Sequence, residues 1–167
     1  MAENRRANSR TERDARKGNT SDADAIQVVK TFIHAINRHA PSEINGLMTE
    51  DHTFIDSGGG IQSGREHMTA GWESYFRLFQ DYRIHAEDIL ADGTTVAVFG
   101  SASGTYNGRR GLVPENRIGM PAAWKAVVEG GKVKHWQVYA DWTEGHRIID
   151  ADKGSGQRMI AGERKHR

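Results

Sequence analysis

Apolar residues in the first half of the chain recur at the three- and four-residue spacing of an amphipathic helix. The first set shares one helix face and comprises Ile26, Val29, Phe32, Ile33 and Ile36. Asp22 or Asp24 can cap this helix, and Pro41 ends it, because a proline inside a helix removes a backbone hydrogen bond. A short second helix then starts at Ser42, with Ile44, Leu47 and Met48 facing inward.

A third helix carries most of the aromatic side chains of this region. Its apolar face comprises Met68, Trp72, Tyr75, Phe76 and Phe79. Ser63 and Glu66 match a capping box, in which each side chain bonds the other residue's backbone N–H. Between the second and third helices we predict a brief strand from His52 to Asp56, followed by a turn of three glycines.

From Tyr82 onward the alternation is typical of strands rather than helices. We predict strands over 82–90, 94–104, 117–129 and 132–142, with Asp92-Gly93 and Gly130-Gly131 as hairpin turns. An antiparallel meander of long strands must bury one face, and the three helices supply the cover. A twisted sheet curled over helices forms a cone. The predicted fold is therefore an α+β cone with room for an enclosed pocket.

Composition narrows the class of protein. The chain has no cysteine, so disulfides, thiolate metal sites and a cysteine nucleophile are excluded. Its N-terminus is polar throughout, and no stretch has the length of apolar sequence that a membrane span needs. We therefore expect a cytoplasmic protein that does not bind membranes.

The net charge of +1 conceals an uneven distribution. Residues 1–20 and 152–167 are basic and lack apolar periodicity, whereas the segment between them is acidic. We predict two disordered basic tails around one domain at 21–151. An acidic domain argues against nucleic-acid binding.

Three segments together resemble a known family. They are FIHAINRHAPSEINGLMTEDHTFIDSGG, SGREHMTAGWESYFRLFQDYRIHAEDILADGTTVAVFGSASGTYNG and MPAAWKAVVEGGKVKHWQVYAD. In order and spacing they are similar to SnoaL-like and ketosteroid-isomerase-like proteins of the nuclear transport factor 2-like superfamily. The resemblance implies a cystatin-like α+β barrel, with three N-terminal helices packed into a curved, mostly antiparallel sheet. It does not fix the function, because such folds host many activities.

Asp56 is the strongest candidate for chemistry. It alternates with Phe54 on one face of its strand, and a large aromatic residue favours the pocket side. A carboxylate enclosed by apolar walls is a stronger base than one in water, which suits a general base. By resemblance, Asp56 lies where ketosteroid isomerases carry their proton-shuttling aspartate. The alternative is structural, since an aspartate before glycines commonly caps a turn.

Other site residues are predicted from the helix face on which they lie or from their alternation along a strand. The expected pocket lining comprises Phe32, Ile36, Phe54, Trp72, Phe76, Trp124, Trp136, Val138 and Ala140. Asp141 lies opposite this face of the last strand, so we place it at the pocket rim or on the surface. His85 could join Asp56 as a dyad, although nothing in the sequence directs it inward. No spacing of histidines and carboxylates matches a metal site, so we expect neither a metal nor a cofactor.

Two specialised activities lack their expected residues. By resemblance, the oxyanion tyrosine of ketosteroid isomerases would fall on Phe32, and residues 117–128 contain no carboxylate. The relay of the epoxide hydrolases of this fold would fall on Gly100, Ala102 and Val138. Neither an authentic steroid isomerase nor such an epoxide hydrolase is therefore expected.

Two functions remain open. The first is a cofactor-independent isomerase, cyclase or lyase that acts on a small apolar carbonyl compound, with Asp56 as general base. The second is a ligand-binding or protein-interaction module without chemistry. The resemblance also implies a homodimer that pairs through the convex sheet face, where His135, Gln137 and Tyr139 would lie.

Overall fold

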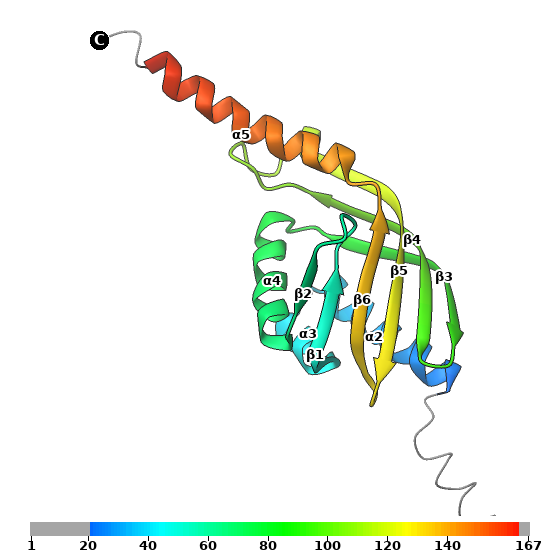
Figure 1. Ribbon diagram of the computed structural model, residues 1–167. Helices are drawn as coiled ribbons and strands as arrows, with labels where there is room; N and C mark the ends of the chain where they lie inside the picture. Colours follow the sequence, from blue (N-terminus) through cyan, green and yellow to red (C-terminus); the bar gives the residue numbers. More distant parts are fainter. Residues whose placement is uncertain (1–20, 164–167) are drawn as a thin grey trace, which may run out of the picture.

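The computed structural model describes residues 21–163 of the chain, with side chains to residue 153, and has α+β architecture (Figure 1). The elements in chain order are α2 (Asp22–Asn37), α3 (Pro41–Leu47), β1 (Met48–Ile55), β2 (Ile61–Ser63), α4 (Arg65–Leu78), β3 (Arg83–Asp92), β4 (Thr95–Thr105), a 3₁₀ turn η1 (Pro114–Asn116), β5 (Arg117–Glu129), β6 (Lys132–Ala140) and α5 (Thr143–Glu163). The predictions for residues 1–20 and 164–167 lie outside the described part of the chain.

The six strands form one curved sheet in the order β2-β1-β6-β5-β4-β3. The meander from β3 to β6 is antiparallel, as predicted, and β1 joins it through a parallel pairing with β6. Both predicted hairpin turns are present. Gly93, Gly130 and Gly131 have positive φ angles of 60°, 56° and 74°, which only glycine adopts without strain. The predicted cone is therefore confirmed, with one parallel pair in an otherwise antiparallel sheet.

Helix α2 packs along the inner face of the sheet, where it builds the core. Its buried face contains Val29, Phe32 and Ile36, each with no exposed surface. The Phe32 ring meets the Trp136 ring of β6 edge-on, with ring centroids 5.3 Å apart. The amide of Asn37 exchanges two 2.8 Å hydrogen bonds with the backbone of Ile84 and so ties the end of α2 to β3. The predicted apolar stripe therefore faces the sheet.

The helix boundaries differ from the prediction at three places. Ser21, rather than Asp22 or Asp24, caps α2, since its Oγ accepts a hydrogen bond from the backbone N–H of Asp24. Pro41 does not end α2 but opens α3, at a position where a missing N–H costs nothing. Met48 begins β1 instead of closing α3, because it pairs with Val133 of β6.

The start of α4 also differs from the prediction. Ser63 is not a helix cap but the last residue of β2, where it pairs with Thr53 of β1. Gly64 occupies the cap position with φ of 95° and without a side-chain hydrogen bond. Glu66 accepts a hydrogen bond from the side chain of Asn45 instead of closing a capping box. Strand pairing therefore overrode the local helix-start signal.

Helix α5 was not predicted at all. It leaves the end of β6 and extends away from the sheet (Figure 1), so the expected domain end at residue 151 falls inside it. Ile148 is buried, and the carboxylate of Asp152 accepts the backbone N–H of Arg109 at 3.1 Å. The first half of α5 thus packs on the loop between β4 and β5. None of the described helices has the length and apolarity required to cross a membrane.

Candidate functional site

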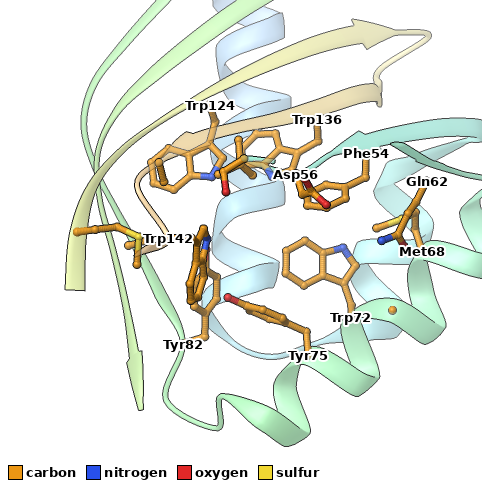
Figure 2. Close-up of a pocket in the computed structure, with 16 residues that line it drawn as sticks. Phe54, Asp56, Gln62, Met68, Trp72, Tyr75, Tyr82, Trp124, Trp136 and Trp142 are labelled. Carbon is orange, nitrogen blue, oxygen red and sulfur yellow. The ribbon is translucent and has the colours of Figure 1, made fainter. Parts of the chain in front are cut away.

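A partly open, apolar cavity of about 240 Å³ lies between α4 and the inner face of the sheet (Figure 2). Its lining comprises Phe54, Asp56, Ser57, Gln62, Met68, Gly71, Trp72, Tyr75, Tyr82, Ala102, Met120, Trp124, Trp136, Val138, Ala140 and Trp142. Seven of these lining side chains are aromatic, and they come from α4, the sheet and the segments beside them. Pockets of this composition bind small, largely apolar molecules.

The structure separates the residues expected in the lining into two groups. Phe54, Trp72, Trp124, Trp136, Val138 and Ala140 border the cavity. Phe32, Ile36 and Phe76 do not border it and lie in the packed core. Phe76 is held between two rings, since it stacks on His39 at 4.3 Å and on Trp72 at 5.3 Å. Sequence periodicity identified the inward faces correctly but could not tell a filled part of that face from a hollow one.

Asp56 borders the cavity just after the end of β1. Its Oδ1 accepts hydrogen bonds from the backbone N–H groups of Gly58 and Gly60, at 2.8 and 2.9 Å. Its Oδ2 has no hydrogen-bond partner among the described residues. One oxygen therefore fixes the glycine turn, and the other has no partner among the described residues. The turn-capping interpretation of Asp56 is present in this geometry, whereas its role as a general base stays a prediction.

Two tyrosines supply hydroxyl groups that the sequence analysis did not assign to the site. Tyr75 of α4 and Tyr82, just before β3, both border the cavity, and their rings meet edge-on at 5.0 Å. Neither hydroxyl has a partner among the described residues. Burial raises the pKa of both side chains above the ordinary value, so both remain protonated hydrogen-bond donors at neutral pH. The helical spacing of Tyr75 and Trp72 was the signal that could have identified Tyr75.

Trp142 forms part of the wall where the chain passes from β6 into α5. Its ring meets the Phe79 ring edge-on, with centroids 5.9 Å apart. Gly145, one helical turn into α5, is buried against the same indole, and a Cβ atom there would overlap ring carbons Cε3 and Cζ3. The absence of a side chain at position 145 therefore allows Trp142 to reach the cavity.

Comparison with known proteins identifies the family. The SnoaL-like domain model matches residues 29–136, which is more than half of the chain. The chain belongs to the SnoaL-like domain family. No curated protein matches the sequence significantly.

Solved structures share the fold of this SnoaL-like domain at low sequence identity. A candidate polyketide cyclase from Xanthomonas campestris is 16% identical, with a TM-score of 0.69 over 77% of this chain and 98% of that one. An LEH-like epoxide hydrolase from M. tuberculosis is 14% identical, with a TM-score of 0.64 and coverage of 80% and 95%. A ketosteroid-isomerase-fold protein from Catenulispora acidiphila in complex with trimethylamine is 18% identical, with a TM-score of 0.63 and coverage of 76% and 92%. At these identities the likeness establishes the fold alone.

In this SnoaL-like domain, the two other candidate residues lie outside the cavity. Asp141 is exposed, and its Oδ1 accepts the backbone N–H of Thr143 at 2.9 Å, which caps the start of α5. Hydrogen bonds from Thr143 lower the pKa of this carboxyl. His85 is exposed on β3 and does not border the cavity, so it forms no dyad with Asp56.

Proposed function

We propose that this SnoaL-like domain is a cofactor-independent enzyme that moves a proton within a small, apolar, carbonyl-bearing substrate. Asp56 is the general base of the proposal, which includes isomerase, cyclase and lyase outcomes. The observation that carries it is the position of Asp56. It is the one carboxylate among the described lining residues, and its Oδ2 has no partner among them.

The chemistry follows from the groups around the cavity. Oδ2 of Asp56 takes a proton from the carbon next to the substrate carbonyl, and the C–H electron pair forms a carbon–carbon double bond. The carbonyl π electrons move to oxygen, which gives an enolate. The hydroxyls of Tyr75 and Tyr82 are the neutral donors that can stabilise this oxygen. Protonated Asp56 then returns the proton to carbon, so the cycle needs no oxidant or reductant.

Tyr75 and Tyr82 can supply the oxyanion donor that is missing at the position expected from the resemblance. Phe32, at the position where the oxyanion tyrosine was expected by resemblance, is sealed in the core and has no hydroxyl. Tyr75 and Tyr82 reach the cavity from α4 and from the segment before β3. The proposed donors therefore come from a different part of the fold.

One observation favours a second function, namely ligand binding without turnover. The two hydrogen bonds that Asp56 accepts from Gly58 and Gly60 are those of a turn-capping aspartate. In that case the cavity holds its ligand and Asp56 only shapes the turn.

Proton exchange distinguishes the two functions. The protein is incubated in D₂O with the bicyclic ketone 2-tetralone, and loss of the α-proton signal is followed by NMR. We expect exchange well above buffer, with Asp56→Asn lowering the rate about 100-fold or more, the usual contribution of a general base. Asp141→Asn is the matched control, because it removes an exposed carboxylate outside the cavity. Bound 2-tetralone that exchanges equally in wild type and Asp56→Asn would establish the binding function instead.

We also propose that the domain forms a homodimer through the outer face of the sheet. Phe99 and Tyr139 flank Ala123 across β4, β5 and β6, and they are 47% and 52% exposed. Gln137 and His135 continue the same face of β6. Light scattering should give twice the 18.6 kDa mass of one chain. A single 18.6 kDa species at high micromolar concentration would contradict the proposal.

A further inference from the structure

The turn between β1 and β2 is closed by backbone hydrogen bonds around the carboxylate of Asp56. The N–H of Asp56 donates to the carbonyl of Gly60, and the N–H of Gly59 donates to the carbonyl of Asp56, both at 3.0 Å. The carboxylate adds to these bonds, because its Oδ1 accepts from the N–H groups of Gly58 and Gly60 at 2.8 and 2.9 Å. The backbone of residues 56–60 is therefore fixed relative to this side chain.

Gly60 leaves open the space that the carboxylate occupies. Ile55 pairs with Ile61, so Asp56 and Gly60 are the next opposed positions and face the same side of the hairpin. A Cβ atom at residue 60 would lie 2.5 Å from Oδ2 and 3.2 Å from Cγ of Asp56. Ordinary contact begins at 3.4 Å, so a side chain at residue 60 would displace Oδ2 by about 1 Å. Gly60 does not have a positive φ angle, so this contact, and not backbone strain, disfavours alanine there.

The carboxylate is the group that would move. The backbone of the turn is held by its own hydrogen bonds and by the pairing of β1 with β2, whereas the Asp56 side chain can rotate. Rotation would take Oδ1 away from its two N–H donors and would change the position of Oδ2 at the cavity border. A displacement of about 1 Å can lower the rate of a catalysed step about 100-fold. The missing side chain at Gly60 therefore affects the carboxylate more than the turn.

We infer that Gly60 is a positioning residue, whose lack of a side chain sets where the Asp56 carboxylate stands at the cavity. The inference rests on the proposed function for one point, namely that this carboxylate acts as the base. The position of the carboxylate does not depend on turnover, so it can be measured separately.

Gly60→Ala tests the consequence for proton exchange. With 2-tetralone in D₂O, the maximal exchange rate should be about 100-fold below that of wild type. The 2-tetralone concentration that gives half of this rate should change little, because Gly60 does not border the cavity. Gly58→Ala is the matched control in the same turn. Its Cβ would lie 3.3 Å from Oδ1, so the carboxylate needs to give way by only a few tenths of an ångström and the loss should be much smaller.

Two further measurements follow the carboxylate without turnover. In protein labelled with ¹³C at the aspartate carboxyl groups, the Asp56 signal is the one that Asp56→Asn removes. Gly60→Ala should shift this signal, and Gly58→Ala should shift it less. A double-mutant cycle in urea then compares Gly60→Ala with and without the carboxylate. We expect Gly60→Ala to lower the urea midpoint of wild type but not that of Asp56→Ala, where the new methyl group meets no carboxylate.

The inference is overturned if the Asp56 signal does not move in Gly60→Ala, or if Gly60→Ala lowers the urea midpoint equally in both backgrounds. It is also overturned if Asp56→Asn abolishes exchange while Gly60→Ala exchanges as fast as wild type. A failure of the proposed function gives a different result. Asp56→Asn then exchanges 2-tetralone as fast as wild type, while the carboxyl signal and the urea cycle still show the coupling between residues 56 and 60.

Discussion

His52 of β1 and Asp56, the residue after its end, lie four residues apart, yet their surroundings differ completely. His52 is 1% exposed, and its ring lies beside Phe32 in the packed core. Asp56 borders an open cavity. The inward side of this segment is therefore core at His52 and candidate site at Phe54 and Asp56.

The difference arises from the helix that lies opposite each end. Around His52 the core is packed, because Phe32 of α2 has no exposed surface and its ring centroid lies 6.2 Å from that of His52. Around Asp56, the facing residues are Trp72 and Tyr75 of α4, which border a space instead of filling it. The comparison shows that a hollow in this fold depends on where a helix stands, and not on the alternation of the strand beneath it.

Truncation of an aromatic side chain should give the largest contrast between the filled half, the core around His52 and Phe32, and the hollow half, the cavity beside Asp56. Phe32→Ala leaves a void in the filled half and should lower the free energy of unfolding by about 3–5 kcal/mol. Tyr75→Phe removes only an unpaired hydroxyl in the hollow half, so the change should be within about 0.5 kcal/mol. Urea denaturation of both variants measures the contrast. Equal losses would mean that the cavity is packed in solution.

Gly145→Ala tests the cavity wall at Trp142, against which Gly145 packs. The new methyl group overlaps the Trp142 ring, and overpacking of this kind costs about 1–3 kcal/mol. Gly46→Ala in α3 is the matched control, because no atom lies within 4 Å of the new Cβ. It should gain up to about 1 kcal/mol through helix propensity. Chemical denaturation is the measurement, and a stabilised Gly145→Ala would exclude the tight contact.

Asp56→Ala tests the structural role of the candidate base. It removes the acceptor of the Gly58 and Gly60 N–H groups and should cost about 1 kcal/mol at pH 7. Asp56→Asn retains an acceptor oxygen and should cost less. Chemical denaturation of the two variants beside wild type checks the order. An Asn variant more stable than wild type would instead indicate relief of a carboxylate that the cavity desolvates.

The smallest expected effect concerns pH and the filled half. Burial lowers the pKa of His52 below its ordinary value of 6.5, so the native side chain is neutral. The unfolded chain then binds the proton more readily, and stability should fall as the pH drops through about 6.5. We expect His52→Gln to flatten this dependence between about pH 7.5 and 5.5, a range above most carboxylate titrations. An unchanged slope in denaturation experiments would show that other groups cause it.

Local pattern predicted the faces of the elements, because side-chain direction follows directly from backbone period. The stripe of α2, the strand alternation and the two glycine hairpins are present as expected. The pattern failed where distant pairing competed with it, as at Ser63, which joins a strand instead of capping a helix. It also missed α5, whose side chains are mostly polar after Ile149.

The sequence by itself determined which residues face inward, including Asp56, Trp72 and Trp124, and it indicated the family. Only the tertiary structure decided which inward residues enclose a space. It placed Phe32 in the core, brought Tyr75 and Tyr82 together at the cavity, and set Gly60 against the carboxylate of Asp56. The physical reason is that periodicity fixes the direction of a side chain, whereas a cavity depends on the distance between a helix and a sheet that lie far apart in sequence.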